Sequence, residues 1–406
     1  MAKILEGLRI IEGSAFVAAP LAGMTLAQMG ADVIRFDRIG GGLDHARWPV
    51  TANGQSLFWA GMNKGKRSLA IDMTKPEAKE IITRLICAPG ADCGIFLTNM
   101  RSRGWLDYDE LRKHREDLIM MSVKGDRRGG PQVDYTVNPS VGFPAATGAE
   151  DSTGPVGHVL PAWDCITGQQ AALAILAAER HRQRTGKGQL IDLALRDVAF
   201  AMLGNLGIIA EVTINGHDRP KLGNSIYGGY AQDFRCADGR RVMVVALTLR
   251  QWDNLCTVTG SRAACEDLGK RLGVDLRREG ERFKARHAIT DILKPWFAAR
   301  RLSDFADAFT SQSVTWSEYQ TFREAVERDP DCSLDNPMFA MTEQPGIGSY
   351  LAPGLPAAFS DVERVAPARA PLLGEHTDEI LTELGYGRKE LDQLRAARII
   401  ASASPV

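Results

Sequence analysis

Asp164 is the residue whose type and position most invite a chemical role. It ends the run Pro161-Ala162-Trp163-Asp164, directly before an alanine-rich segment, residues 165–182, with apolar residues at helical spacing. One interpretation is structural, because aspartate often caps the N-terminus of a helix. The other is chemical, because a carboxylate partly removed from water near backbone N–H donors can act as a nucleophile. The local sequence leaves both open.

Other catalytic chemistries find less support. Cys165 has no histidine or cationic residue beside it in the sequence, which favours a buried helical cysteine over a nucleophile. The seven histidines are dispersed, without H-x-x-x-H spacing or a cluster with cysteine, so no metal site is expected. No G-x-S-x-G nucleophile elbow occurs either.

Length and charge limit the class of protein. The 406 residues correspond to two or three domain-sized units, and 49 Lys+Arg against 50 Asp+Glu exclude a polyanion-binding surface at the level of the whole chain. The N-terminus lacks the apolar core of a signal peptide, and no apolar run approaches the length of a membrane span. The seven cysteines have no CxxC pair and suggest reduced thiols. We therefore expect a cytoplasmic protein that binds neither nucleic acid nor membrane.

Alternating strands and helices predict an α/β fold with a Rossmann-like parallel sheet. Strands are expected over residues 8–12, 31–37, 68–73, 93–98, 118–123 and 190–195, and helices over 19–29, 76–87 and 197–214. The opening βαβ unit implies a right-handed crossover between parallel strands. This pattern predicts a large domain over residues 1–220.

The pattern changes near Lys221. Residues 234–246 read as a hairpin with a tight Asp-Gly turn, and residues 291–300 as a helix. Residues 330–359 are rich in turn formers, and residues 372–400 hold two short helices. We therefore expect a small α/β domain over 221–330, followed over 331–406 by a linker and a C-terminal segment that returns to the large domain.

Cations follow several of the predicted strands. The fingerprint G-x-G-x-x-G is missing from the first turn, although Asp37 ends the second strand where a ribose-binding acid would stand, so a nicotinamide cofactor is not expected. A solvated surface would explain the cations, but open α/β sheets bind ligands at these strand ends, which favours an anionic ligand with several phosphates. The cations are Arg38, Lys64, Lys66, Arg67, Arg101, Arg103, Lys124, Arg127 and Arg128.

Four blocks in order carry a family resemblance. They are LEGLRIIE to GADVIRFD (residues 5–37), NKGKRSLAID (63–72), Asp164 with its helix and TGKGQLID (185–192), and PLLGEHTDEI (371–380). Through them the chain resembles the family III CoA-transferases, which include formyl-CoA:oxalate and carnitine CoA-transferases. The resemblance implies that family's α/β fold and interlocked homodimer, an acyl-CoA substrate, and no prosthetic group or metal.

Shorter stretches narrow the implied reaction. EGSAFVAAPL (12–21), IRFDRIGGGLD (34–44), DYTVNP (134–139) and HVLPAWD (158–164) most resemble members that move CoA between the C1 and C4 carboxyls of mesaconate. The resemblance implies Asp164 as nucleophile, with aspartyl anhydride and aspartyl-CoA thioester intermediates. An intermolecular transferase, for example from succinyl-CoA to another acid, and an acyl-CoA racemase or hydratase remain alternatives, as does a binding protein without catalysis.

The resemblance also implies ligand contacts, residue by residue. Those to CoA are Phe16, Val17, Ala18, Arg38, Ile71, Asn99, Met100, Arg103 and Lys124. Arg47 is a candidate for the second carboxylate of a dicarboxylate, although an exposed surface arginine explains it equally well. Tyr227, Gly228 and Gly229 are further candidates for contacts with the substrate, because they stand where relatives carry a glycine-rich lid. Val17 stands where relatives carry a polar side chain.

Overall fold

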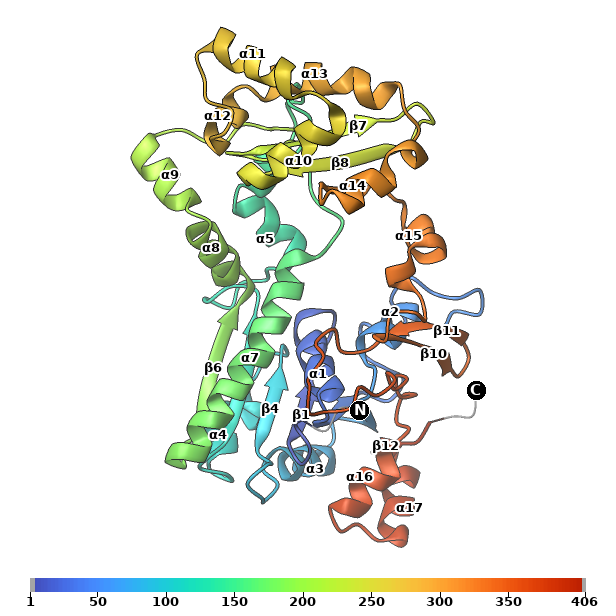
Figure 1. The fold of residues 1–406 in the computed structure, drawn as a ribbon. Coiled ribbons are helices and arrows are strands. Elements are labelled where there is room, and N and C mark those ends of the chain that lie inside the picture. The colour runs from blue at the N-terminus through green and yellow to red at the C-terminus, as the bar shows by residue number, and fades with distance from the viewer. Residues whose placement is uncertain (1–3, 404–406) are drawn as a thin grey trace. The chain divides into compact units, whose positions relative to one another are not determined.

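The chain divides into two compact units in the computed structural model, which describes residues 4–403 (Figure 1). The first unit comprises residues 4–141, 159–213 and 330–403, and the second comprises residues 142–158 and 214–329. The segment 142–158 therefore leaves the large unit and joins the small one. No periodicity in the sequence predicts that residues 142–158 pack with the second unit.

A seven-stranded sheet forms the centre of the first unit, in the order β12-β3-β2-β1-β4-β5-β6. Its neighbouring strands are parallel, except that β12 pairs antiparallel with β3. The order β3-β2-β1-β4-β5-β6 is that of the doubly wound Rossmann fold, so the predicted parallel α/β architecture is confirmed. The strands are β1 Arg9–Gly13, β2 Asp32–Asp37, β3 Arg67–Ile71, β4 Ile95–Thr98, β5 Ile119–Lys124, β6 Gln189–Ala194 and β12 Ile400–Ala401.

Helices cover this sheet and bury its apolar side chains. Ile11, Phe36 and Phe96 on adjacent strands form part of a core that also includes Ile82 and Leu381 from helices. The helical elements of the first unit are α1 Ala18–Gln28, α2 Leu57–Met62, α3 Pro76–Ile86, η1 Gly104–Leu106, α4 Tyr108–Arg112, α5 Asp134–Ser140, α7 Ala162–Thr185, α8 Leu195–Asn205, η3 Pro330–Cys332, α16 Thr377–Glu383 and α17 Arg388–Ala396. Helix α9 (Ile208–Asn215) runs from the first unit into the second.

Two predicted elements of this unit are wrong in detail. The single helix expected over residues 197–214 is two helices, α8 and α9, which bend by 61° at Leu206 and Gly207, where Gly207 has a φ of 76°. The expected linker over residues 330–359 contains an antiparallel hairpin, β10 Phe339–Gln344 with β11 Gly348–Pro353. Turn-forming residues on both sides of these short strands hide them from the sequence.

No single helix among residues 4–403 has the length and apolar character to cross a membrane, and only the bent pair α8 and α9 meets those criteria jointly.

The second unit has a three-stranded antiparallel sheet, β7 Tyr230–Arg235, β8 Arg241–Ala246 and β9 Thr315–Glu318. The β7–β8 pair confirms the hairpin predicted from the Asp-Gly turn. Its core includes a stack of Phe234 on Phe297, whose ring centroids are 4.2 Å apart. The helical elements are α6 Phe143–Ala146, α10 Leu249–Thr259, α11 Arg262–Leu272, α12 Glu279–Lys284, α13 Arg286–Ala298, η2 Leu302–Asp304, α14 Ala306–Ser311 and α15 Phe322–Arg328.

The strand order reverses between β1 and β4 in the first unit. Connections after these two strands diverge at such a switch point, and open α/β sheets bind ligands in the crevice that results. The segments concerned are residues 14–17, which lead into α1, and residues 99–103, which follow β4.

Candidate active site

A cavity of about 1060 Å³ lies at the switch point and is lined by the first unit. Its size suits a large organic ligand. Of the residues named from the sequence, ten line it together: Phe16, Val17, Ala18, Arg47, Asn99, Met100, Arg101, Arg103, Lys124 and Asp164. The sheet thus gathers residues from several distant parts of the chain into one site.

The segment after β1 is held by two side chains. The backbone N–H of Ala15 donates to Oδ1 of Asn99 (2.9 Å), and Nδ2 of Asn99 donates back to the Ala15 carbonyl (2.7 Å). The N–H of Phe16, a residue with a φ of 70°, donates to Oδ2 of Asp44 (3.1 Å). Helix α1 begins directly afterwards, and Val17 at its N-cap provides no side-chain hydrogen bond. The first N–H groups of α1 are therefore left without a side-chain cap at the cavity wall.

Ion pairs between buried side chains stabilise this segment. Arg35 donates to Asp37 (2.9 Å) and to Asp44 (2.9 Å), and Lys66 donates to Glu12 (2.8 Å), all in the interior. Asp37 and Lys66 therefore stabilise the fold through buried ion pairs and are not exposed to a ligand. For Lys66, the expectation of a cation that meets an anionic ligand is wrong.

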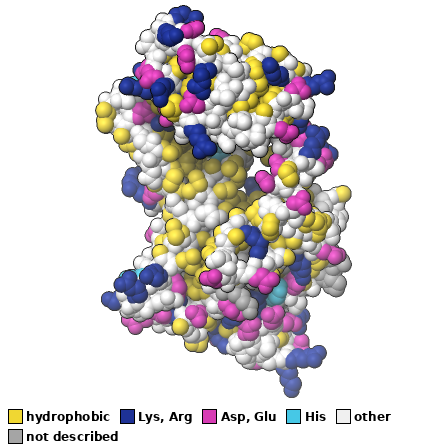
Figure 2. Space-filling view, viewed as in Figure 1, with side chains coloured by type: hydrophobic (Ala, Val, Ile, Leu, Met, Phe, Trp, Pro, Cys, Tyr) yellow, Lys and Arg dark blue, Asp and Glu magenta, His cyan; other side chains and the backbone are white. Residues whose placement is uncertain are grey.

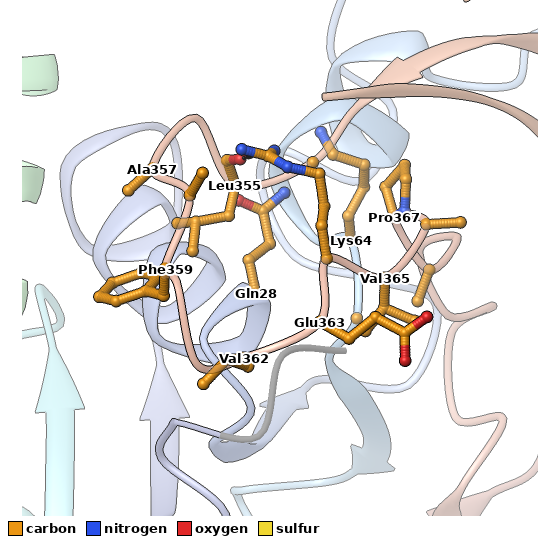
Figure 3. Close-up of a pocket in the computed structure, with 15 residues that line it drawn as sticks. Gln28, Lys64, Leu355, Ala357, Phe359, Val362, Glu363, Val365 and Pro367 are labelled. Atoms are coloured by element: carbon orange, nitrogen blue, oxygen red, sulfur yellow. Dashed lines mark hydrogen bonds between the residues drawn. The ribbon is translucent and has the colours of Figure 1, made fainter. Parts of the chain in front are cut away.

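Lys64 is also buried, in a second cavity beneath residues 354–368 (Figure 3). Phe359, Val362 and Val365 are among the side chains that line this cavity. Lys64 donates to the carbonyl oxygen of Gly61 (2.7 Å), and burial lowers the pKa of Lys64 to about 8. Lys64 does not line the cavity that contains Asp164, so the expectation of an anion-binding role is wrong for Lys64 as well.

Helix α7 places Asp164 in its first turn and not at its cap. The helix begins at Ala162, three residues earlier than predicted, and its N-terminal donors are satisfied by Asp134 of α5. Oδ2 of Asp134 accepts the backbone N–H groups of Trp163 (2.7 Å) and Asp164 (3.1 Å). Nε1 of Trp163 donates to Oδ1 of Asn138 (3.1 Å) and ties the two helices together. The capping interpretation of Asp164 is therefore wrong, and its carboxyl group is left for another role.

The surroundings of Asp164 raise its pKa to about 7. Burial is the main cause and the negative charge of Asp134 adds to it, whereas the positive charge of Arg47 acts in the opposite direction. A carboxyl group that titrates near neutrality is more basic than an ordinary aspartate and hence a better nucleophile once ionised. The neighbouring Cys165 thiol has a raised pKa, because of burial and then of the two carboxylates, which supports its assignment as a non-nucleophile.

Arg47 is held at the cavity between two aromatic rings. Its guanidinium carbon lies 5.3 Å from the ring centroid of Phe16 and 5.3 Å from that of Phe58. Such stacking orients the planar guanidinium and leaves its N–H donors available at the edge. Because its charge also reaches Asp164, Arg47 provides a cation close to the candidate nucleophile.

Other cations line the cavity towards β4 and β5. Arg101 and Arg103 follow β4, and Lys124 ends β5, where its Nζ lies 2.5 Å from Oδ1 of Asp192. Arg38 and Ile71 lie outside this lining. Arg38 donates to the carbonyl of Gly41 (2.6 Å), and Ile71 is fully buried beside β12, so their roles rest on the resemblance alone.

Three further candidates belong to the second unit. The ring of Tyr227 packs against Phe283 (5.3 Å between centroids), and the guanidinium of Arg219 lies 4.5 Å from its centroid. Gly228 has a φ of 79°, and a Cβ on Gly229 would come 2.8 Å from Leu247. The role of Tyr227, Gly228 and Gly229 as substrate contacts stays a prediction.

Asp134 is a residue of the site that reasoning from the sequence did not single out. It stands 30 positions before Asp164, and no spacing rule connects a residue at the start of one helix with the start of another. Two signals in the sequence involve it: Asp134 opens DYTVNP, one of the stretches that carry the resemblance, and an aspartate at the start of a helical segment is typical of an ordinary cap. Among the described residues no group of three or more His, Cys, Asp and Glu could hold a metal ion, and no histidine is among the described residues that line the cavity.

Residues 5–377 match the family model described as CoA-transferase family III. The chain belongs to this family. It is accordingly an enzyme that acts on CoA thioesters, and the resemblance noted in the sequence is confirmed. The family model spans both units and so includes the cavity around Asp164.

Individual relatives support the same assignment. The chain is 59% identical to a 2-methylfumaryl-CoA isomerase of Chloroflexus aurantiacus, over 99% of this chain and 98% of the relative. It is 29% identical to a succinyl-CoA:mesaconate CoA-transferase of Haloarcula hispanica, over 94% and 97%. The fold resembles the crystal structure of a CAIB/BAIF family protein from Brucella suis, with a TM-score of 0.76 and 26% identity, covering 95% of this chain and 100% of that one.

Proposed function

We propose that this family III enzyme moves CoA between the C1 and C4 carboxyls of mesaconate, converting 2-methylfumaryl-CoA into 3-methylfumaryl-CoA. The main support is the 59% identity to a 2-methylfumaryl-CoA isomerase over nearly the whole of both chains. The geometry is compatible, because one cavity holds a basic carboxylate, Asp164, and a stacked cation, Arg47. A dicarboxylyl thioester needs both groups.

The first half of the reaction transfers the acyl group to Asp164. A carboxylate oxygen of Asp164 attacks the thioester carbonyl, the C–S bond breaks, and CoA leaves as the thiolate, which is a good leaving group. The thiolate then attacks the aspartyl carbonyl of the mixed anhydride. This step breaks the C–O bond and yields an aspartyl-CoA thioester with free mesaconate, which remains in the cavity.

The second half repeats these steps with the other carboxylate of mesaconate. That carboxylate attacks the aspartyl thioester and expels the thiolate, which then attacks the mesaconyl carbonyl of the new anhydride. The products are the isomeric thioester and the Asp164 carboxylate. No proton is gained or lost in the cycle, so the site needs oxyanion donors and exclusion of water rather than an acid–base pair.

Residues of the cavity have distinct parts in this scheme. The uncapped N–H groups at the start of α1, including that of Ala18, stabilise the oxyanion, as helix N-termini stabilise anions. Arg47 holds the carboxylate that is not reacting. Arg103 and Lys124 interact with the phosphates of CoA. Val17 contributes only its backbone, because it has no polar side-chain atom.

A homodimer is part of the proposal. Leu206 is 60% exposed and Leu173 is 68% exposed, and several large apolar side chains nearby in sequence are also exposed. Figure 2 shows hydrophobic side chains over α8 and α9. A second copy of the chain that covers them is consistent with the rule that large exposed apolar patches mark interfaces. We propose a cytoplasmic enzyme on the basis of the sequence features described above.

One incubation separates the candidate reactions. The enzyme is mixed with 2-methylfumaryl-CoA and excess ¹³C-labelled free mesaconate. The thioesters are separated by chromatography, and mass spectrometry measures the ¹³C content of each. Intramolecular transfer produces the positional isomer without label, and a parallel incubation without mesaconate gives the same isomer. Labelled thioester, or a requirement for an acceptor, would show an intermolecular transferase instead.

Two further measurements locate the nucleophile and exclude the racemase. Borohydride trapping followed by peptide mapping is expected to modify Asp164, and Asp164→Ala is expected to give neither trapped enzyme nor isomer. A racemase exchanges an α-hydrogen, which 2-methylfumaryl-CoA lacks, so the enzyme is also incubated in D₂O with 2-methylsuccinyl-CoA, whose α-carbon is expected to take up no deuterium. Deuterium at the α-carbon would support proton exchange and contradict acyl transfer.

A further inference from the structure

The two carboxylate oxygens of Asp134 differ in the hydrogen bonds that they accept. Oδ2 accepts two backbone N–H groups, whereas Oδ1 is buried and accepts no hydrogen bond from the described residues. Asp134 is 1% exposed and lines the same cavity as Asp164. A buried carboxylate oxygen without a partner is costly, and such exceptions call for an explanation.

The start of α7 is a place where an anion is normally stabilised. Backbone N–H groups and the helix dipole both favour negative charge there. In this enzyme the N–H groups of Trp163 and Asp164 bind Asp134 rather than the carboxylate of Asp164. The nucleophile therefore stands at a helix N-terminus without receiving the stabilisation that such a position offers.

The charged surroundings of Asp164 are few. Asp134 faces it from α5 and Arg47 from the segment between β2 and α2, while Cys165 is its titratable neighbour on α7 itself. Helix α1, which packs on α7, contains no charged residue. On β5, Lys124 is paired with Asp192 of β6, and on α8 the guanidinium of Arg196 lies over the ring of Phe200. Asp134 is thus the source of negative charge beside the nucleophile.

We infer that Asp134 is a positioning residue of the transfer reaction: it fixes the first turn of α7 through Oδ2 and, through its negative charge, keeps the Asp164 carboxylate destabilised and reactive. This inference rests on the proposed role of Asp164 as nucleophile. It assigns to Asp134 two effects, one on geometry and one on charge, that substitutions can separate.

The charge effect favours acylation of Asp164. Two carboxylates in a poorly solvated site repel each other, and the repulsion disappears when one of them becomes an anhydride or a thioester, because its charge is lost. Asp134 thus raises the free energy of the free enzyme relative to both covalent intermediates. A strictly neutral cap would hold the helix equally well and would not have this effect.

Asp134→Asn tests the charge while it keeps the cap. The amide oxygen still accepts the two N–H groups, and the negative charge is gone. The midpoint of the rise of kcat/KM with pH is expected to move down by about one pH unit, and the limiting rate above that midpoint to fall about threefold, because a less basic nucleophile reacts more slowly. A midpoint and limiting rate equal to those of the unmodified enzyme would overturn the inference.

Two more variants separate charge from structure. Asp134→Ser removes the charge but keeps a short acceptor, so it is expected to shift the midpoint in the same direction and to lower Tm. A purely structural role would lower Tm and leave the midpoint unchanged. Asp238→Asn is the matched control, because Asp238 also accepts two backbone N–H groups, those of Arg240 and Leu302, in the second unit. It is expected to change neither midpoint nor rate.

A titration without substrate keeps this inference distinct from the proposed function. Protein labelled with ¹³C at the aspartate carboxyl carbon is titrated by NMR, and the Asp164 signal is identified by its loss in Asp164→Asn. Its midpoint is expected near pH 7 in the unmodified protein and about one unit lower in Asp134→Asn. If 2-methylfumaryl-CoA is not isomerised, the proposed function fails while this titration still decides the role of Asp134. An unshifted midpoint would refute that role even in an active isomerase.

Discussion

Gly168 approaches Ala18 so closely that a Cβ added to the glycine would stand 2.7 Å from the backbone oxygen of Ala18. Gly168 lies one turn after Asp164 on the same face of α7, and Ala18 is the first residue of α1. The contact therefore sets the separation between Asp164, the proposed nucleophile, and the N–H groups at the start of α1. A glycine is required here by the close approach of two helices.

Gly168→Ala is expected to lower both Tm and kcat. Alanine in a helix interior is normally more stable than glycine by about 1 kcal/mol, so a rise in Tm would show that the close approach is unimportant. The added methyl group meets a backbone oxygen that cannot move alone, and α1 must shift away from Asp164. Calorimetry and steady-state kinetics measure the two effects. Gly61→Ala in α2 is the control, because nothing lies within 4 Å of its added Cβ.

Arg47→Gln is expected to impair dicarboxylyl thioesters selectively. Loss of a charged hydrogen bond to the second carboxylate costs about 2 kcal/mol, or about a 30-fold decrease in kcat/KM for 2-methylfumaryl-CoA. Arg47→Lys is expected to recover little, since a lysine does not reproduce a planar group stacked between Phe16 and Phe58.

Crotonyl-CoA has no second carboxylate and serves as the comparison thioester. With crotonyl-CoA, the rate of borohydride trapping in Arg47→Gln is expected to stay within threefold of the rate in the unmodified enzyme. Equal losses for both thioesters would assign Arg47 to the CoA portion or to the fold. Arg84→Gln provides the control, because Arg84 stacks on Tyr386 (5.0 Å) and does not line the cavity of Asp164.

Local patterns were sufficient to predict the elements but not their connections in space. Strand and helix periodicities located the parallel sheet, and the Asp-Gly turn located the β7–β8 hairpin, because these signals lie within a few residues. The break at Gly207 escaped prediction, since the residues on both sides of it continue one apolar helical pattern. The segment 142–158 could not be assigned to the second unit, because only tertiary packing determines its partner.

The candidate site shows the same division. Asp164 was identifiable from its position before a helix, but its cap was not, because Asp134 reaches it from α5. Nor does the sequence distinguish Lys124, which faces the cavity, from Lys64 and Lys66, which are buried. Each follows or precedes a strand, and burial depends on the segments that fold over them.

Lys64→Met is expected to stabilise the protein at pH 7. Burial lowers the pKa of Lys64 to about 8 in the folded state against 10.5 in the unfolded chain, so its contribution to stability is present above pH 10.5 and is lost as the pH falls through 8. After allowance for the lost hydrogen bond to Gly61, the free energy of unfolding of Lys64→Met at pH 7 is expected to exceed that of the unmodified protein by about 2 kcal/mol.

Thermal denaturation at pH 7 and pH 10 checks this sign. The gain in Tm is expected at pH 7 and is expected to shrink at pH 10, where the buried amine of the unmodified protein is uncharged. Lys187→Met, at an exposed position after α7, is expected to change Tm little at either pH. A loss of Tm at pH 7 would mean that Lys64 is stabilised by its surroundings in the charged form.

Asp164→Asn is expected to inactivate the enzyme and to stabilise its fold above neutral pH. The pKa of Asp164 is about 7 in the folded state and 3.8 in the unfolded chain, so the stability associated with this group is fully present below 3.8 and is lost as the pH rises through 7. Allowing for partial solvent screening, Asp164→Asn is expected to raise the free energy of unfolding by about 2 kcal/mol at pH 8, which is a few degrees in Tm, and to change it very little at pH 4.

Asp126→Asn provides a control of opposite sign. The backbone N–H groups of Gly130 and Arg128 lower the pKa of Asp126, so loss of this carboxylate should reduce Tm at pH 8. If Asp164→Asn and the unmodified protein melt at the same temperature at pH 8, the carboxylate is not destabilised by its site, and its reactivity has to come from the bound substrate.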